Sequence, residues 1–341
     1  MRLRGALIGF GQVAQNAHVP AFHSSEDVEI VAVADTAPAL RAQAAQAFPG
    51  AKTYASLKDL LAGEKRLDFV DLATPPWLHG AQALEALEQD LHVLCEKPLT
   101  LDVSQLRQLA QSAARREKTV FTVHNWAYAP IWAKAQELLA QGAIGEPRHA
   151  ELHVLRTKPA PGQQGDWRMD RRLAGGGILV DHGWHNLYLL RRCLFPAGAA
   201  QSPLLTSAVL HRPMPTGAED EATVFFQFSQ ATALVRLSWR ASSRSNTALI
   251  QGSTGTLELR DDRILLSSVG KPEQAFSFPQ KLSAGSAHPE WFSAMLPDFL
   301  AEIRDHRQRG RNLAEAGFVL DLITRAYAVP TPAQPLEQMA A

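Results

Sequence analysis

The sequence predicts an α/β protein that begins with a doubly wound parallel sheet and continues as an α+β unit with several antiparallel strands. Two observations carry this prediction. Short apolar runs alternate with helical patterns over residues 1–124, and strand-like stretches follow one another directly over residues 204–278. Apolar strands separated by helices form parallel sheets with both faces covered, whereas consecutive strands tend to pair in antiparallel order.

The chain length favours two domains. A length of 341 residues is too great for one ordinary domain, and a hydrophobic fraction of 46% can supply a core for each of two. The pattern changes after Asn125, so we place the domains at residues 1–124 and 125–341.

The first domain alternates strands with helices. The expected strands are Leu3–Ile8, Glu29–Ala34, Lys52–Tyr54, Phe69–Ala73, His92–Leu94 and Thr119–Val123. The helical patterns between them are Val13–His23, Pro38–Phe48, Leu57–Ala62, Leu78–Gln89 and Val103–Lys118. Pro38 suits a helix start, because the first turn of a helix has no use for the missing N–H.

The second domain combines a few helices with a series of strands. The expected helices are Pro130–Ala140, Ile178–Cys193, Glu290–Arg309 and Asn312–Ala328. The expected strands are Arg148–Arg156, Leu205–His211, Ala222–Phe228, Ala231–Ala241, Thr247–Gly252, Gly255–Leu259 and Ile264–Ser267. A loop rich in proline, glycine and glutamine, Lys158–Gly165, separates the first of these strands from the triple glycine Gly175–Gly177.

Composition excludes several classes of protein. Lys plus Arg number 34 and Asp plus Glu number 34, so the formal net charge is zero, which argues against a nucleic-acid partner. Apolar runs fall far short of the roughly 20 residues that a membrane span needs. The two cysteines, Cys95 and Cys193, are too few for a disulfide scaffold and fit the reducing cytoplasm, where we expect the protein.

A glycine motif between the first strand and the first helix indicates dinucleotide binding. Gly9-Phe10-Gly11-Gln12-Val13-Ala14 matches G-x-G-x-x-A. The first glycine permits a tight turn, the second lets the backbone approach a pyrophosphate, and Ala14 allows close helix–strand packing. This context predicts a Rossmann-type domain in which residues Gly9 to Val13 bind the cofactor.

Asp35 indicates which cofactor is bound. It ends the second strand, 24 residues after Gly11, where a carboxylate accepts the ribose hydroxyls of NAD. Thr36, Ala37 and Pro38 offer no cation for the 2′-phosphate of NADP, so we expect NAD, with NADP open through Arg41.

Three polar residues form the chemical signal. Lys97, in Glu96-Lys97-Pro98, follows a strand of the parallel sheet, and ligands bind beyond the carboxyl ends of such strands. Asp181 and His185 are four residues apart in a helical stretch, so their side chains share one helix face. Imidazole is suited to take a hydroxyl proton near neutral pH, and an ammonium group can stabilise charge on the same oxygen.

Four motifs together resemble the glucose–fructose oxidoreductase / inositol dehydrogenase (Gfo/Idh/MocA) family. They are Gly9–Ala14, Thr74-Pro75-Pro76-x-x-His79, Glu96-Lys97-Pro98 and Gly175-Gly176-Gly177-x-x-x-Asp181-x-Gly183-x-His185, in the family's order. The resemblance implies a Rossmann domain, a C-terminal domain with a large open sheet, and NAD(P)-dependent oxidation or reduction of a sugar, cyclitol or related polyol.

The resemblance also assigns residues. It implies Lys97, Asp181 and His185 as the catalytic set, with His185 as the acid/base group and Asp181 orienting its neighbours. It adds cofactor contacts at Thr74, Pro75, His79, Glu96, Lys97 and Asn125.

The substrate side departs from the family pattern. His182 stands where an aliphatic residue is usual, and Tyr188 replaces a frequent Asp. We expect substrate contacts from Lys97, Asp181, His182, His185 and Tyr188, and from Trp167 and Arg168 in the preceding loop. Arg168 could hold a carboxylate or phosphate. Trp126 and Trp184 are aromatic candidates for the pocket or for the core.

Other functions stay open at this point. Asp181, His182 and His185 could ligate a metal, but His185 already has a role and we expect no metal. The same residues could serve a glycoside-cleaving enzyme that oxidises its sugar transiently and retains its NAD. A non-catalytic NAD-binding sensor or co-regulator is the alternative of a different class. The resemblance implies a homodimer or homotetramer formed through the C-terminal sheet.

Overall fold

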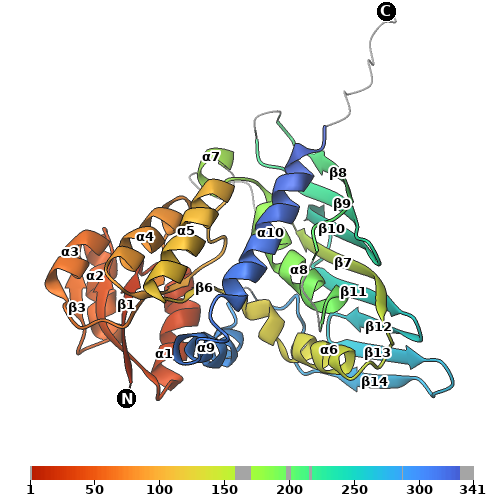
Figure 1. The fold of residues 1–341 in the computed structure, drawn as a ribbon, viewed down its shortest axis with the longest axis horizontal. Helices are drawn as coiled ribbons and strands as arrows, with labels where there is room; N and C mark the ends of the chain where they lie inside the picture. The colour runs from red at the N-terminus through yellow and green to blue at the C-terminus, as the bar shows by residue number, and fades with distance from the viewer. Residues whose placement is uncertain (1, 158–169, 197–200, 215–216, 286, 331–341) are drawn as a thin grey trace, which may run out of the picture.

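The computed structural model describes residues 2–157, 170–196, 201–214, 217–285 and 287–330. The chain forms two sheets with helices between and around them, and the two sheets lie on opposite sides of the molecule (Figure 1). This architecture confirms the predicted fold class.

Sheet A is the parallel sheet of the first half of the chain. Its strands are β1 (Leu3–Ile8), β2 (Val28–Ala34), β3 (Lys52–Tyr54), β4 (Phe69–Leu72), β5 (His92–Cys95) and β6 (Val120–Thr122), in the order β3-β2-β1-β4-β5-β6. Strand order reverses between β1 and β4, and the crevice at such a point is where nucleotides bind.

Helices cover both faces of sheet A, which explains why its strands read as continuous apolar runs. The helices of this half are η1 (Ala14–His18), α1 (Val19–Ser24), α2 (Pro38–Ala47), α3 (Leu57–Gly63), α4 (Pro76–Glu88) and α5 (Val103–Arg116). Alternate residues of β4 show the two faces: Phe69 packs in the core cluster that contains Phe22 of α1, and Val70 packs in the cluster with Ala83 of α4.

Sheet B is mostly antiparallel. Its strands are β7 (Pro147–Thr157), β8 (Leu205–His211), β9 (Glu221–Gln227), β10 (Thr232–Ala241), β11 (Ser245–Gly252), β12 (Gly255–Arg260), β13 (Arg263–Ser268) and β14 (Gln274–Ser277). Their order is β14-β13-β12-β11-β7-β10-β9-β8, and the central pair β7–β10 is parallel.

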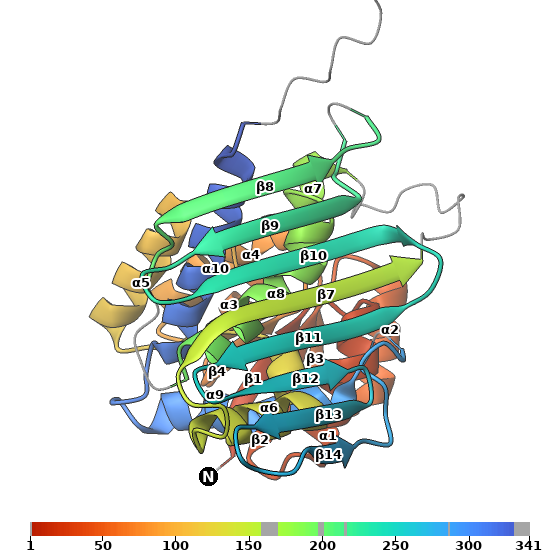
Figure 2. The same ribbon diagram turned by 90° about the vertical axis from the view of Figure 1, so that its right-hand side faces the viewer.

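Helices line only one face of sheet B in the described chain. They include α6 (Pro130–Ala140), α8 (Ile178–Leu194) and α10 (Arg311–Ala328), which lie between the two sheets (Figure 1), while the strands present an open face to the viewer in Figure 2. Two short helices, η2 (Asn125–Tyr128) and α7 (Arg171–Ala174), complete this half with α9 (Pro289–Arg304).

The structure differs from the sequence prediction at four of the elements in the described chain. The predicted helix Glu290–Arg309 ends at Arg304, because the carboxylate of Glu302 accepts the backbone N–H groups of Gly310 and Asn312 and so starts a separate helix. The short helix α7 and the mostly exposed strand β14 lack a strong apolar pattern and escaped prediction. The helix predicted at Val13–His23 contains a π-helical turn, Ala14–His18.

Helix α9 returns from the end of the chain to sheet A. Phe292, Met295 and Phe299 belong to the same core cluster as Leu7 and Phe69. We therefore keep the domain division at residues 124/125 as a proposal. In this division, α9 belongs to the second domain and packs into the core of the first. In the described part of the chain, no helix combines the length and apolar character that crossing a membrane requires.

Candidate functional site

The predicted cofactor residues gather at one edge of sheet A. The segment 9–13 follows β1, Asp35 follows β2, Thr74 follows β4, Glu96 follows β5, and Asn125 follows β6. Because all these strands are parallel, their carboxyl ends share one edge. Asn125 is half-buried there, and Gln12 and Val13 are exposed.

The turn after β1 has the shape that a pyrophosphate needs. Gly9 has a φ of +89°, and a Cβ at this residue would lie 2.8 Å from the carbonyl oxygen of Ala73, so only glycine fits without strain. A Cβ at Gly11 would meet nothing within 4 Å, which leaves room for a ligand against the backbone. Phe10 is buried beneath this turn. The residues present therefore fit NAD.

Asp35 is fixed beside the same turn. One carboxylate oxygen accepts the N–H of Phe10 at 2.8 Å, and the other accepts the N–H of Ala37 at 2.8 Å. Each oxygen keeps a second lone pair for a ribose hydroxyl. Arg41 lies at this point as well, with Nη1 donating to the carbonyl oxygens of Asp35 at 2.8 Å and Thr36 at 3.0 Å.

The loop after β4 is tied to the loop after β5 by His79. Its Nε2 lies 2.7 Å from the carbonyl oxygen of Thr74, and its Nδ1 lies 2.7 Å from that of Pro98, which follows a cis peptide bond. The Thr74 hydroxyl donates to the Oε1 atom of Gln82. His79 is buried, so in our proposal it holds the two loops together, and the half-buried Thr74 and Pro75 face the cofactor.

A buried ion cluster that sequence reasoning missed lies beneath Glu96. His18, in the π-helical turn, has Nδ1 2.6 Å from Asp71 Oδ2 and Nε2 3.1 Å from Glu96 Oε1. Burial disfavours the imidazolium, but the two carboxylates outweigh that effect and raise the pKa of His18 to about 10. The signal in the sequence was a lone Asp inside an otherwise apolar strand, Phe69-Val70-Asp71-Leu72.

Lys97 and Asp181 meet across the interface between the two halves of the chain. The Nζ atom of Lys97 lies 2.7 Å from Asp181 Oδ1 and donates to the Asp181 carbonyl oxygen at 3.1 Å. Burial disfavours the charged carboxylate, but the Lys97 ammonium outweighs it and holds the pKa of Asp181 well below its usual range. The Lys97 side chain is 17% exposed, so the ammonium group remains reachable.

His185 lies one turn further along α8. Its Nδ1 atom is 2.9 Å from the hydroxyl oxygen of Tyr188, which also accepts the backbone N–H of Trp126 at 3.0 Å. The Trp126 ring stacks on the His185 ring at 4.8 Å. Burial, with a smaller contribution from the charge of Lys97, lowers the pKa of His185 well below 6.5, so the ring is neutral at physiological pH.

A second buried network connects α8 with α10 and with His124. Glu315 of α10 accepts from Nε and Nη2 of Arg192 at 2.9 Å each, and its Oε2 lies 2.7 Å from Nδ1 of His124. Nε2 of His124 accepts the indole N–H of Trp184 at 3.1 Å. These bonds anchor α8 through Trp184 and Arg192, three and eleven residues after Asp181.

The structure separates the predicted substrate residues into two groups. Lys97, Asp181 and His182 are partly exposed, with His182 Nε2 3.7 Å from Asp181 Oδ2. Tyr188 and Trp184 are fully buried core residues, and Tyr188 contacts His185. Trp126, 9% exposed, is the aromatic side chain that stays beside His185. The predicted contacts Trp167 and Arg168 lie outside the described residues.

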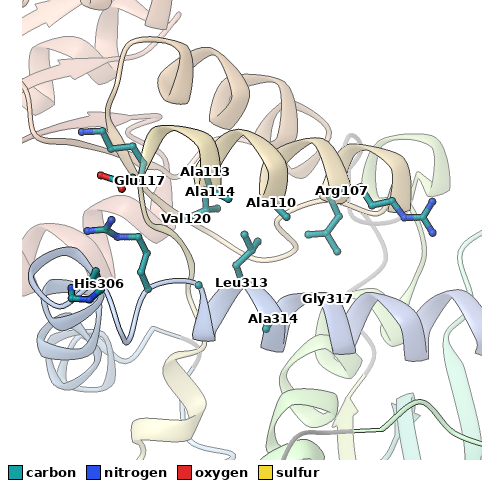
Figure 3. A pocket seen from close by; sticks show the side chains of 14 residues that line it. Arg107, Ala110, Ala113, Ala114, Glu117, Val120, His306, Leu313, Ala314 and Gly317 are labelled. Carbon is teal, nitrogen blue, oxygen red and sulfur yellow. The ribbon is translucent and has the colours of Figure 1, made fainter.

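Two further features of the described chain lie apart from this site. A cavity of about 570 Å³ opens between α5 and α10 (Figure 3), and none of its lining residues belongs to the cofactor or catalytic set. Within the described ranges, no group of three His, Cys, Asp or Glu side chains could hold a metal ion. Cys95 and Cys193 are buried free thiols whose pKa values burial raises.

Comparisons with known proteins agree along the chain. A family model described as an oxidoreductase family with an NAD-binding Rossmann fold matches residues 3–124, and the GFO/IDH/MocA C-terminal domain matches residues 132–258. A protein of Amycolatopsis mediterranei, provisionally named as the oxidoreductase subunit of UDP-kanosamine synthase, is 30% identical over 355 residues and covers 96% of each chain.

Two other similar proteins extend the comparison. The D-glucoside 3-dehydrogenase of Escherichia coli is 28% identical over 232 residues, which cover 67% of this chain and 63% of that protein. The crystal structure of an NAD-binding oxidoreductase from Klebsiella pneumoniae superimposes with a TM-score of 0.83 at 21% identity and covers 96% of both chains. This structural likeness supports the fold.

The geometry around Asp35 predicts a preference for NAD. A 2′-phosphate about 4 Å from this carboxylate would be repelled by roughly 4 kcal/mol at an effective dielectric near 20, and a third of that gives about tenfold discrimination. We expect Asp35→Ser with Thr36→Arg to shift the ratio of dissociation constants toward NADP, measured by calorimetry, while the exposed Glu88→Ser leaves it unchanged. Equal or tighter binding of NADP by the wild-type protein would mean that Arg41 supplies the missing charge.

Proposed function

The chain belongs to the Gfo/Idh/MocA family of oxidoreductases with an NAD-binding Rossmann fold, and on that premise we propose that it transfers a hydride between nicotinamide and a polyol carbon. The reacting group is a secondary alcohol or ketone of a sugar, cyclitol or related polyol. The observation that carries the proposal is the Lys97–Asp181 contact of 2.7 Å with His185 one turn away. The name of the similar D-glucoside 3-dehydrogenase supports a carbohydrate substrate.

Each residue has a chemical task in this proposal. The turn from Gly9 to Val13 and the Asp35 carboxylate hold NAD, which when bound supplies the hydride acceptor or donor. His185 takes the hydroxyl proton during oxidation and returns it during reduction. Lys97 donates a hydrogen bond to the same substrate oxygen and stabilises the charge that develops there, while Asp181 orients the ammonium group.

The base role of His185 requires one tautomer. Nε2 can accept a proton only if Nδ1 carries the proton of the neutral ring and donates it to the Tyr188 oxygen, 2.9 Å away. That oxygen has two lone pairs, one for this bond and one for the N–H of Trp126. Tyr188 is therefore a positioning residue. Burial raises its pKa well above 10, so it cannot share the proton transfer.

Two alternative functions can be distinguished from the proposed one, by net NADH formation and by the arrangement of the catalytic residues. A glycoside-cleaving enzyme would use the same residues but return the hydride to its sugar, so it would form no net NADH. A non-catalytic sensor would have no need for the ion pair that holds Lys97 next to Asp181, or for a neutral His185 beside them.

We also propose the cytoplasm as the location, which cell fractionation can test.

Replacing Lys97 tests the proposed function. We expect Lys97→Ala to lower kcat for NADH formation on its best polyol by two or more orders of magnitude, because the substrate oxygen loses its charged donor. The dissociation constant for NAD should stay within about threefold, since Lys97 follows β5 and is not part of the turn from Gly9 to Val13. The exposed Lys58→Ala is the control. Collapse of NAD binding in a folded Lys97→Ala protein would contradict the assigned role.

The pKa of His185 predicts where the pH profile bends. The base form is the neutral ring, and burial lowers its pKa, so kcat/KM for oxidation should hold from pH 8 down to 6.5 and fall only below that value. We expect His185→Asn to flatten this acidic limb and to lower kcat sharply, whereas His306→Asn on the surface changes neither. A variant that keeps the wild-type limb and rate would move the acid/base role to Lys97.

We propose that the open face of sheet B forms a homodimer or homotetramer. Leu205 and Val209 alternate along β8 on that face and are strongly exposed, whereas Ala208 between them packs inward. Val209→Lys should reduce the mass of the wild-type oligomer in sedimentation experiments, while Val269→Lys in the β13–β14 turn should not. A monomeric wild-type protein would overturn this proposal.

A further inference from the structure

A buried arginine that no carboxylate of the described residues contacts lies near the end of β7. Arg156 is 5% exposed, and its Nη1 atom donates to the carbonyl oxygen of Leu155 at 2.9 Å and to Asn246 Oδ1 at 3.0 Å. Its Nε atom is buried and has no acceptor. Among the described residues, no carboxylate lies within 4.0 Å of this guanidinium. Burying a charge without a counter-ion is costly, so the missing partner calls for an explanation.

A second arginine approaches from the start of β11. Arg244 is exposed, and its Nε and Nη2 atoms donate to the carbonyl oxygens of Ser283 at 3.0 Å and Gly285 at 2.8 Å. These acceptors orient the side chain but do not neutralise it. Burial is the main cause that lowers the pKa of Arg156 to about 10, and the nearby charge of Arg244 adds to this shift.

The carboxylates of this region are engaged elsewhere. Asp261 accepts the N–H and the hydroxyl of Ser283, at 2.8 Å and 2.6 Å. Glu290 lies 3.4 Å from Nδ1 of His288. Asp181 is paired with Lys97. Across the described chain, therefore, no carboxylate contacts Arg156 or Arg244.

The two arginines belong to the substrate side of the site. The Arg156 guanidinium lies 5.8 Å from the centre of the Trp126 ring, and that ring stacks on His185. Burial is the main cause that lowers the pKa of His182 to about 4. Asp181 opposes this shift, and the charges of Arg156, Lys97 and Arg244 add to it. Arg156 and Arg244 therefore share one electrostatic environment with Asp181 and His182.

The nearby carboxylates act on Arg156 only from a distance. Lys97 and Asp181 pair with each other, and Asp261 acts on Arg156 electrostatically without contacting it. The low pKa values of His182 and His185 keep both rings neutral. Two buried nitrogen atoms near Arg156, Asn246 Nδ2 and His182 Nδ1, have no partner in the described chain. Arg156 therefore lacks a contacting counter-ion there, which an anionic group of the substrate would supply.

We infer that the substrate is a polyol that carries an anionic group, a carboxylate or a phosphate, which Arg156 and Arg244 bind beside the reacting carbon. The inference rests on the proposed function, because it assigns the substrate class of the same site. The planar donor fork of arginine matches both kinds of oxyanion, and a partly desolvated pair of such groups binds more strongly than an exposed one.

Matched sugars test this inference in the NAD-loaded protein. The probes are D-glucose, D-glucuronate, D-glucose 1-phosphate and UDP-glucose, which share a ring and differ in the charged group. Two readouts are taken for each probe: the dissociation constant by calorimetry and kcat/KM for NADH formation. We expect at least one anionic probe to bind ten times more tightly than glucose, and the comparison among the three identifies carboxylate or phosphate as the preferred group.

Arginine variants decide whether the predicted side chains cause the preference. Arg156→Gln and Arg244→Gln should each reduce the ratio of anionic to neutral affinity at least fivefold, whereas Arg115→Gln, exposed on α5, should leave it unchanged. Arg244 is exposed, so its variant serves the test even if the buried Arg156→Gln does not fold. An unchanged ratio in folded variants, or failure of every anionic probe to bind more tightly than glucose, overturns the inference.

The two readouts keep this inference distinct from the proposed function. Anionic probes that bind through the arginines without NADH formation would support the inference and count against net oxidation. NADH formed from glucose at a rate that no anionic probe exceeds would support the proposed function and overturn the inference.

Discussion

The contact between Lys97 and Asp181 joins two parts of the chain that are 84 residues apart. Lys97 follows a strand of sheet A, and Asp181 stands in the first turn of α8, which packs on sheet B. A 2.7 Å ion pair between the two elements therefore sets the distance between the cofactor side and the substrate side. Because both charges are partly desolvated, either one left alone would be destabilising, and the pair constrains both elements at once.

Buried charge networks hold each end of that ion pair. On the sheet A side, His18 bridges Asp71 and Glu96 directly beneath the Lys97 backbone, whose N–H bonds to Glu96. On the α8 side, Glu315 connects Arg192 with His124. Removing one member of such a network leaves a buried charge without a partner, which typically costs about 3–5 kcal/mol. Both networks depend on the end of the chain, since the Phe292 ring of α9 contacts the His18 ring and Glu315 belongs to α10.

The substrate side combines a stacked aromatic surface with a buried arginine that no carboxylate contacts in the described chain. Trp126 supports His185, and Arg156 lies over the same ring. Two aromatic candidates from the sequence, Trp184 and Tyr188, are buried in the core. Trp184 donates to His124, and the Tyr188 oxygen is hydrogen-bonded to His185. In our proposal, selectivity for a substrate therefore depends on the arginines as well as on aromatic stacking.

The sequence by itself determined the doubly wound sheet, the glycine turn, Asp35, and the positions of Lys97, Asp181 and His185, because strand and helix periodicities and short motifs are local. It could not determine the His18–Asp71–Glu96 cluster or the surroundings of Arg156, which no carboxylate contacts in the described chain, since the residues involved are distant in the sequence and only packing brings them together. The boundary between α9 and α10 was also not predicted correctly. There the carboxylate of Glu302, in α9, accepts the backbone N–H groups of Gly310 and Asn312 at the start of α10. Burial lowers the pKa of both His18 and His185, but the two carboxylates that contact His18 reverse the shift there, so His18 is charged and His185 is neutral.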